Sequence, residues 1–156
     1  MWSIPNGYST VTLNICEVIM LKVNFHDSAD DSLLKFAVIA ARHNGRWVFC
    51  KHRDRITYEC PGGHREIGEA INDTAKRELW EETGAVNYSL KDICAYSVTV
   101  DGTTTFGMLY YADIFDFEPL PQLEIERIEF FKELPDSWTY PLIQPKLIAK
   151  VKEIID

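Results

Sequence analysis

Five charged residues lie at fixed spacings in the middle of the chain. Glu69 is followed eight positions later by Arg77, which directly precedes Glu78, and then by Glu81 and Glu82. Carboxylate oxygens are hard ligands that suit Mg²⁺ or Mn²⁺. Such an ion neutralises phosphate oxygens and lowers the pKa of a bound water. The residue types therefore favour metal-assisted attack of water on a phosphate group.

These residues lie on a predicted helix from about residue 69 to 82, which Gly84 is placed to terminate. At 100° per residue, the acids share one stripe with the small apolar residues of the helix; its members are Ile71, Ala75, Glu78, Glu81 and Glu82. Like charges at this spacing repel by roughly 0.2–0.5 kcal/mol even in water, and burial raises the cost. A bound cation would remove this conflict, whereas the alternative is an acidic face turned to solvent.

The segment from Gly63 to Ala85 resembles the Nudix box, which reads Gly, five residues, Glu, seven residues, Arg-Glu-apolar-x-Glu-Glu-x-Gly-apolar. At typical residue usage, seven fixed identities arise by chance about once in 10^8 at any one position. Leu79 fills the first apolar place, and Ala85 stands where the family usually has Val, Ile or Leu. The matching fixed positions are Gly63, Glu69, Arg77, Glu78, Glu81, Glu82 and Gly84.

The resemblance implies a Nudix-type α/β/α sandwich with a mixed β-sheet, and a metal-dependent pyrophosphohydrolase that uses Mg²⁺ or Mn²⁺. It assigns the metal to Glu78, Glu81 and Glu82, with Glu78 favoured as the group that accepts the proton of the attacking water. The Gly63 carbonyl is a further expected ligand, because the Pro-Gly-Gly sequence ending there allows close backbone approach. The expected catalytic residues are Glu78, Glu82 and Arg77.

Two further roles follow from the resemblance. Arg77 is expected to orient the glutamates through charge-assisted hydrogen bonds, with Glu69 as an outer ligand or loop anchor. Many family members also use an acid beyond the box. Glu124, Glu126 and Glu129 are the candidates here, and Glu129 is the preferred metal ligand; an ordinary surface charge is the alternative for each.

Substrate contacts are predicted on both sides of the box. Lys51, Arg53 and Arg55 alternate along a strand-like segment, so that they could face the phosphates together; a positively charged sheet edge is the alternative. Gln144, at the start of the last helix, is the candidate for base recognition, since the Asn that reads the base in oxidised-nucleotide sanitisers is not evident.

Within the family, the chain looks like MutT-like members that act on nucleoside triphosphates. The first expectation is a sanitiser of oxidised nucleotides of the 8-oxo-dGTP type, and the alternative is an enzyme that removes pyrophosphate from triphosphorylated RNA 5′ ends. Two hypotheses of other classes are a nucleotide-sensing Nudix domain without turnover and an interaction domain with a structural acidic helix. The expected partner is thus a nucleotide-type small molecule.

The elements that position these residues can be read from periodicity and turn signals. Asn44-Gly45 and Asp101-Gly102 are strong two-residue hairpin signals. The C-terminal apolar residues recur at helical spacing, with Pro145 tolerable in the first turn. The predicted strands lie in 10–25, 33–41, 46–52, 93–100, 103–115 and 128–131, with a polar loop at 26–32.

Composition narrows the function classes. The 156 residues predict a single domain, 1–156. Sixteen basic and 24 acidic residues give a net charge of −8, which argues against non-specific binding to duplex DNA or an anionic membrane. Four cysteines without a C-x-x-C pair indicate free thiols in a reducing compartment. With no signal peptide and no apolar run of about 20 residues, we expect a soluble cytoplasmic protein.

Overall fold

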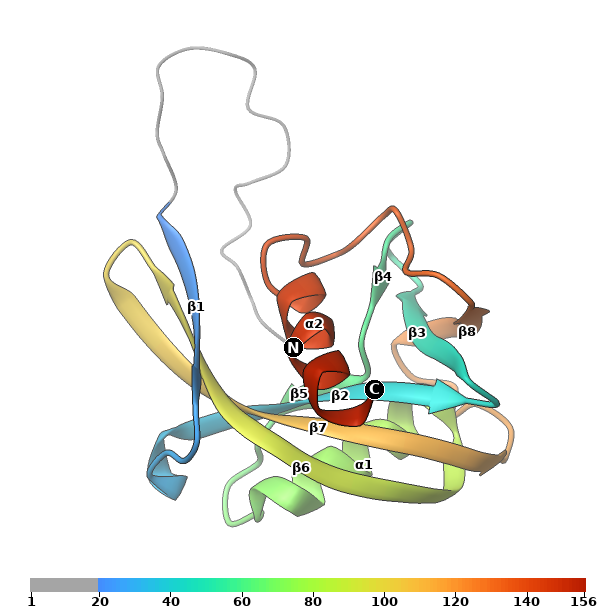
Figure 1. Ribbon diagram of the computed structural model, residues 1–156. Helices are drawn as coiled ribbons and strands as arrows, with labels where there is room; N and C mark the ends of the chain where they lie inside the picture. Colours follow the sequence, from blue (N-terminus) through green and yellow to red (C-terminus); the bar gives the residue numbers. More distant parts are fainter. Residues whose placement is uncertain (1–19) are drawn as a thin grey trace.

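The computed structural model describes residues 20–156 (Figure 1). Its architecture is one mixed sheet of eight strands with two helices. The strands are β1 (Leu21–His26), β2 (Leu34–His43), β3 (Arg46–His52), β4 (Tyr58–Glu59), β5 (Gly62–His64), β6 (Ala85–Val100), β7 (Thr103–Phe117) and β8 (Ile125–Phe131). The helices are α1 (Ile71–Thr83) and α2 (Gln144–Ile155), and a 3-10 turn, η1, covers Asp31–Leu33.

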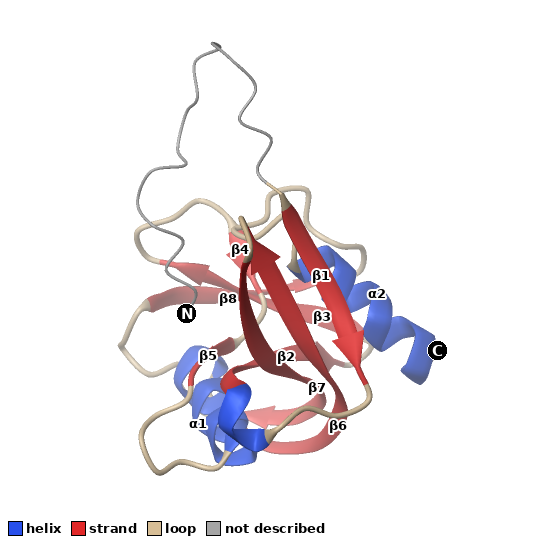
Figure 2. Ribbon diagram, turned by 90° about the vertical axis from the view of Figure 1, so that its left-hand side faces the viewer, coloured by secondary structure: helices blue, strands red, loops and turns tan. Residues whose placement is uncertain are grey.

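The sheet runs in the order β1-β6-β7-β2-β3-β4, with β5 added beside β2 and β8 beside β3. The pairing of β2 with β7 is parallel, and the other strand pairs are antiparallel. The two helices lie on opposite sides of the sheet (Figure 2). The predicted mixed α/β sandwich is therefore confirmed.

Strand β2 shows why the sheet has two covered faces. Phe36, Val38 and Ala40 belong to the apolar cluster that includes α2, whereas Ala37 and Ile39 belong to the cluster that includes α1. All five are buried. Because successive side chains of a strand point to opposite faces, a strand covered on both faces is apolar throughout.

Both predicted hairpin turns are present. Asn44 and Gly45 have φ values of 50° and 74°, and Asp101 and Gly102 have 47° and 83°. Two consecutive positive φ values are the signature of a type I′ turn, whose twist matches that of the flanking strands. The first turn joins β2 to β3, and the second joins β6 to β7.

Several element boundaries differ from the prediction. Strand β6 begins at Ala85 rather than near residue 93, because Tyr88 and Leu90 alternate into the core on the α1 side. The polar loop at 26–32 contains the start of η1, and β8 begins at Ile125. The predicted strand in 10–25 is described only from Leu21, since residues 1–19 lie outside the described part of the chain.

Two expectations from composition can be compared with the structure. Cys50, Cys60 and Cys94 are free thiols and are buried, whereas Cys16 lies outside the described residues. Among residues 20–156, neither helix has the length and hydrophobicity needed to cross a bilayer.

Candidate active site

The acidic stripe of α1 points into the protein. The residues Glu78 and Glu82 are buried, with 8% and 7% of their surface exposed, and Glu81 is half-buried. Ala75 and Leu79 on the same helix are fully buried. The helix therefore buries carboxylates together with its apolar residues, as the periodicity predicts.

Gly84 ends the helix where the sequence predicts. It has the left-handed φ of 77°, and its N–H donates to the Trp80 carbonyl over 2.8 Å. A side chain at this position would also collide with the chain that follows β7, because a Cβ would lie 2.5 Å from the Glu118 carbonyl oxygen. Glycine thus satisfies both the turn and the packing.

An open pocket of about 460 Å³ lies beside the three glutamates, within the usual size range of small-molecule sites. Its walls come from β5 and the loop after it, from α1, and from the beginning of β8. It is lined by His64, Arg65, Glu66, Arg77, Glu78, Glu81, Glu82, Leu123, Glu124 and Ile125.

Arg77 holds the carboxylates along one edge of this pocket. Its Nε and Nη2 donate to the two oxygens of Glu69 over 2.8 and 3.0 Å, and Nη1 donates to Glu78 over 2.8 Å. A longer contact of 3.5 Å reaches Glu81. The Arg77 hydrogen bonds hold the pKa of Glu69 down to about 2. This geometry agrees with the orienting role expected of Arg77.

Gly62 and Gly63 bring the backbone against the other side of the glutamates. A Cβ on Gly63 would lie 2.2 Å from Glu78 Oε1, so only glycine leaves room for that carboxylate. The Gly62 N–H donates to Glu82 Oε2 over 3.3 Å. The Pro-Gly-Gly sequence therefore supports Glu78 and Glu82 directly.

Burial disfavours the charged form of both carboxylates. Burial raises the pKa of Glu82 well above its usual range, and the negative charges of Glu78 and Glu59 raise it further. Burial also raises the pKa of Glu78, although Arg77 opposes the shift. A hard divalent cation suits this donor set and would relieve the repulsion.

Within residues 20–156, no group of three or more potential ligand side chains is already arranged around a cation position. Glu78 and Glu81 instead contact Arg77.

Of the three acids beyond the box, the structure brings Glu124 to the pocket. Its carbonyl accepts a hydrogen bond from the Arg53 N–H over 3.0 Å, which fixes the backbone there. The preference for Glu129 does not agree with this geometry. Glu129 accepts hydrogen bonds from Tyr58 and Arg127, both over 2.7 Å, and it does not line the pocket.

The register of β8 explains the position of Glu129. This residue pairs with Phe49, and residues paired directly across a sheet share a face. Phe49 belongs to the apolar cluster on the α2 side. Glu129 therefore faces away from α1. Glu126, three positions earlier on the strand, forms an ion pair with Lys51 Nζ at 2.7 Å.

The three basic residues do not share the predicted strand face. Strand β3 ends at His52, and residues 53 and 54 form a turn, so the alternation stops after Lys51. Arg53 is exposed, and Arg55 Nη1 donates to Glu59 Oε2 over 3.1 Å. The strand alternation on which the prediction rests therefore does not extend to Arg53 and Arg55, and a phosphate contact by these residues stays a prediction.

Gln144 lies at the beginning of α2, as predicted, but it is buried. Its Oε1 accepts a hydrogen bond from the Cys60 N–H over 2.8 Å. The structure thus gives Gln144 a packing contact that joins α2 to the segment before Pro61, and its role in base recognition stays a prediction.

Glu59 is a residue that the sequence did not single out. It is fully buried and pairs in register with Cys50, whose Sγ donates to the Glu82 carbonyl. Burial raises the pKa of Glu59, and the Arg55 charge opposes this shift. The residues next to Glu59 in the sequence give no sign that it is buried. Its burial becomes evident only from its place in the sheet, opposite Cys50.

We expect Arg55→Ala to destabilise the protein by about 1–3 kcal/mol, because Glu59 would lose its charged hydrogen-bond donor while staying buried. A raised folded-state pKa gives stability that is present at low pH and is lost as the pH rises through that pKa. The loss of Arg55 raises the pKa of Glu59 further. The deficit should therefore grow between pH 5 and pH 8 in urea unfolding measurements.

Arg53→Ala is the matched control for this prediction. Its side chain is exposed, so the change should stay within about 0.5 kcal/mol at both pH values. Equal stabilities of the two variants, or a deficit of Arg55→Ala that shrinks as the pH rises, would contradict the pairing of Arg55 with Glu59.

Comparison with known proteins relates this site to one family. The family profile described as "NUDIX domain" matches residues 32–139. The "Putative 8-oxo-dGTP diphosphatase YtkD" of Bacillus subtilis (strain 168) is 33% identical over 118 residues, which cover 75% of this chain and 74% of that protein. A "MutT-like protein" of Streptomyces ambofaciens is 40% identical over 48 residues, 31% of each chain.

Solved structures show the same fold. A crystal structure of the Bacillus subtilis pyrophosphohydrolase BsRppH has a TM-score of 0.73 and 30% sequence identity, covering 86% of this chain and 91% of that one. A NUDIX hydrolase from Nitrosomonas europaea has a TM-score of 0.63 at 21% identity, covering 77% and 89%.

Proposed function

Since the chain belongs to the Nudix family of pyrophosphohydrolases, which act on phosphoanhydride bonds, we propose that it cleaves the triphosphate of a nucleotide with Mg²⁺ or Mn²⁺ as cofactor. The observation that carries this proposal is the burial of Glu78 and Glu82 beside the pocket, against the Gly62-Gly63 backbone. Acidic side chains are rarely buried without a partner charge, and among the described ion pairs of these two residues only Glu78 has a basic partner, Arg77.

Glu78, Glu81 and Glu82 would hold the cation, together with the Gly63 carbonyl. When bound, the cation supplies neutralisation of the phosphate oxygens and a water of lowered pKa. Glu78 accepts the proton of the attacking water at a carboxylate oxygen. Arg77 keeps that carboxylate in place through its 2.8 Å hydrogen bond, and Glu124 adds a further acidic side chain to the lining of the pocket.

An oxidised purine nucleoside triphosphate of the 8-oxo-dGTP type is the first candidate substrate. Its support is the 33% identity to the Bacillus subtilis protein named for that activity, over three quarters of each chain. A triphosphorylated RNA 5′ end is the second candidate. The openness of the pocket favours it, because a polynucleotide could continue from the triphosphate into solvent.

A nucleotide-sensing domain without turnover is less well supported, because the chain keeps all the acids of the box. To distinguish a sensing domain from an enzyme, we would measure phosphate or pyrophosphate release from a panel of substrates with Mg²⁺, with Mn²⁺ and with chelator. The panel contains deoxynucleoside triphosphates, their 8-oxo forms, ADP-ribose, dinucleoside polyphosphates and triphosphorylated RNA.

We expect pyrophosphate release from a triphosphate substrate and loss of that release with chelator. The catalytic efficiencies measured with dGTP, with its 8-oxo form and with triphosphorylated RNA then rank the substrates. Metal-independent binding of nucleotides without release from any of them would instead identify a sensing domain.

A further inference from the structure

Arg65 connects two segments that are distant in the sequence. Its Nη2 donates to Asp31 Oδ2 over 2.9 Å and its Nη1 to the Asp31 carbonyl over 2.8 Å, so it binds the 3-10 turn η1. Its Nε donates to the Glu69 carbonyl over 2.6 Å, at the other end of the loop that it begins. All three nitrogens of the guanidinium are thereby engaged.

The loop between β5 and α1, residues 65–70, is held by polar contacts, of Arg65 at both ends and of Glu69 with Thr74 and Arg77. Ile67 is fully exposed, and Gly68 has a φ of 77° with open space around it. A segment without buried apolar side chains is fixed mainly by its polar contacts. Arg65 supplies contacts at both ends of this loop, and its planar fork of donors suits such bridging better than a lysine would.

The same loop carries the acid that holds Arg77. The Glu69 carboxylate accepts hydrogen bonds from the Glu66 N–H over 3.0 Å and from Thr74 Oγ1 over 2.7 Å, as well as from Arg77. Arg77 in turn contacts Glu78 and Glu81. Direct contacts therefore run without a break from η1 to the glutamates of the pocket.

We propose that Arg65 is a positioning residue for the cation site. It fixes the 65–70 loop on η1, so that Glu69 holds Arg77 and Arg77 holds Glu78 and Glu81. The inference rests on the proposed function, because it takes these glutamates to be the cation ligands. Partners behind metal ligands commonly contribute ten- to a hundredfold to metal affinity.

Direct contact with the substrate is the competing role for Arg65, since this residue also lines the pocket. The observed geometry favours positioning, because the donors point to Asp31 and to the Glu69 carbonyl. The two roles differ in what they change. Positioning changes cation affinity and kcat, whereas a phosphate contact changes the KM for the nucleotide.

The test is Mn²⁺ binding to the full chain without substrate, measured by electron paramagnetic resonance. We expect Arg65→Ala to weaken Mn²⁺ binding by about tenfold or more, with kcat lowered and the nucleotide KM within about threefold of wild type. Arg65→Lys should recover part of the affinity. Weaker nucleotide binding with unchanged Mn²⁺ affinity would overturn the proposal.

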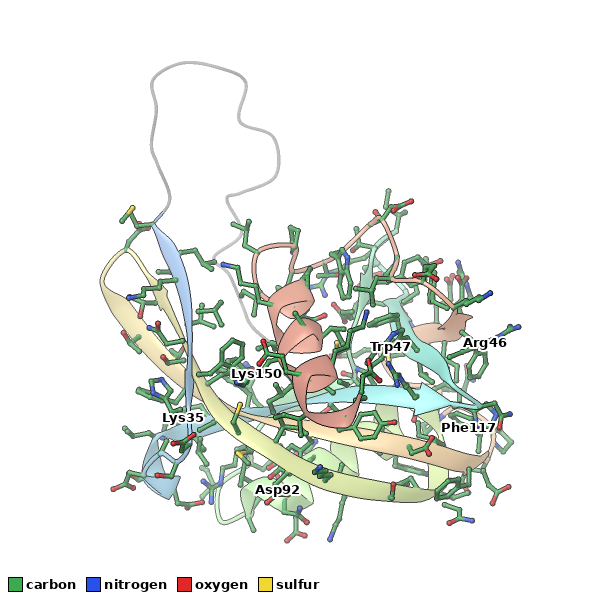
Figure 3. All side chains as sticks on the ribbon, in the orientation of Figure 1. Lys35, Arg46, Trp47, Asp92, Phe117 and Lys150 are labelled. Carbon is green, nitrogen blue, oxygen red and sulfur yellow. The ribbon has the colours of Figure 1, made fainter. Side chains whose placement is uncertain are left out.

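Lys35→Ala is the matched control. Lys35, labelled in Figure 3, lies near the beginning of β2, and its Nζ donates to the Ser32 carbonyl of the same turn η1. It lines the same surface hollow as Arg65 but has no contact with Glu69 or Arg77 among the described hydrogen bonds. Lys35→Ala should leave the Mn²⁺ affinity unchanged. If it weakened Mn²⁺ binding as much as Arg65→Ala does, the effect of Arg65 would be one of general charge, which would contradict the positioning role.

A double-mutant cycle with Glu69→Gln tests the route of the effect. If Arg65 acts through Glu69, adding Arg65→Ala to Glu69→Gln should weaken Mn²⁺ binding by less than about twofold. Full additivity would overturn the proposed route. If Arg65→Ala does not fold, the Mn²⁺ affinities of Asp31→Asn and Arg65→Lys replace it as the test. Weaker binding by these variants would support the inference, and wild-type affinity in both would overturn it.

Failure of this inference can be distinguished from failure of the proposed function. A wild-type chain that neither binds Mn²⁺ nor releases pyrophosphate contradicts the proposed function. An active, Mn²⁺-binding wild type with an indifferent Arg65→Ala variant contradicts only the positioning role.

Discussion

Glu82→Gln should lower kcat by roughly a hundredfold or more while the protein stays folded. The substitution keeps the shape of the buried side chain, and an amide can still accept the Gly62 N–H. It removes one of the negative charges that would hold the cation against the phosphates. Loss of a preorganised electrostatic contact in a transition state commonly costs a hundred- to a thousandfold in kcat.

A second glutamine variant controls for the change of residue type. Glu153→Gln replaces an exposed acid of α2 that pairs with Lys150, and we expect its kcat to equal that of wild type. Circular dichroism and thermal unfolding should show both variants folded. Activity of Glu82→Gln within threefold of wild type would contradict its assignment to the cation site.

Divalent cations should raise the thermal midpoint of the wild-type protein. The unfolded chain cannot assemble the site, so binding stabilises the native state by about 2.7 kcal/mol at a cation concentration 100 times Kd. For a domain of this size that corresponds to roughly 5–11 °C. Melts with chelator, Mg²⁺ and Mn²⁺ at constant ionic strength measure the shift.

The Glu78→Gln, Glu82→Gln double variant should lose this shift. It should also melt at a higher temperature than wild type in chelator, because two buried carboxylates that repel each other have been neutralised. Active sites often carry such a cost in stability. If the cation raised the thermal midpoints of wild type and double variant equally, it would be binding to other acidic residues of this chain, whose net charge is −8.

Much of the fold could be predicted from short-range signals. Asn44-Gly45 and Asp101-Gly102 determine their hairpins because both residues of such a turn have a positive φ, which few residues other than Asn, Asp and Gly accept. The inward stripe of α1 follows from helical periodicity alone. The sequence does not predict that β6 begins at Ala85, because half of residues 85–92 are polar and their strand structure depends on pairing with β7.

The parts of the site that were missed depend on register and on contacts distant in sequence. The alternation through Lys51, Arg53 and Arg55 looks like one strand face, but β3 ends at His52. The choice between Glu124 and Glu129 depends on which residue of β8 faces Phe49. The contact between Arg65 and Asp31 joins residues 34 positions apart, so no local pattern could indicate it.

The most direct test of the central claim is a titration of Mg²⁺ against pyrophosphate release from one nucleoside triphosphate, starting from chelator-treated protein. We predict no release without the cation, saturating release as Mg²⁺ is added to wild type, and a maximum at least about a hundredfold lower for Glu82→Gln. Release by wild type that is equally fast in chelator, or a Glu82→Gln curve that matches wild type, would contradict the claim that the buried glutamates of α1 hold the catalytic cation.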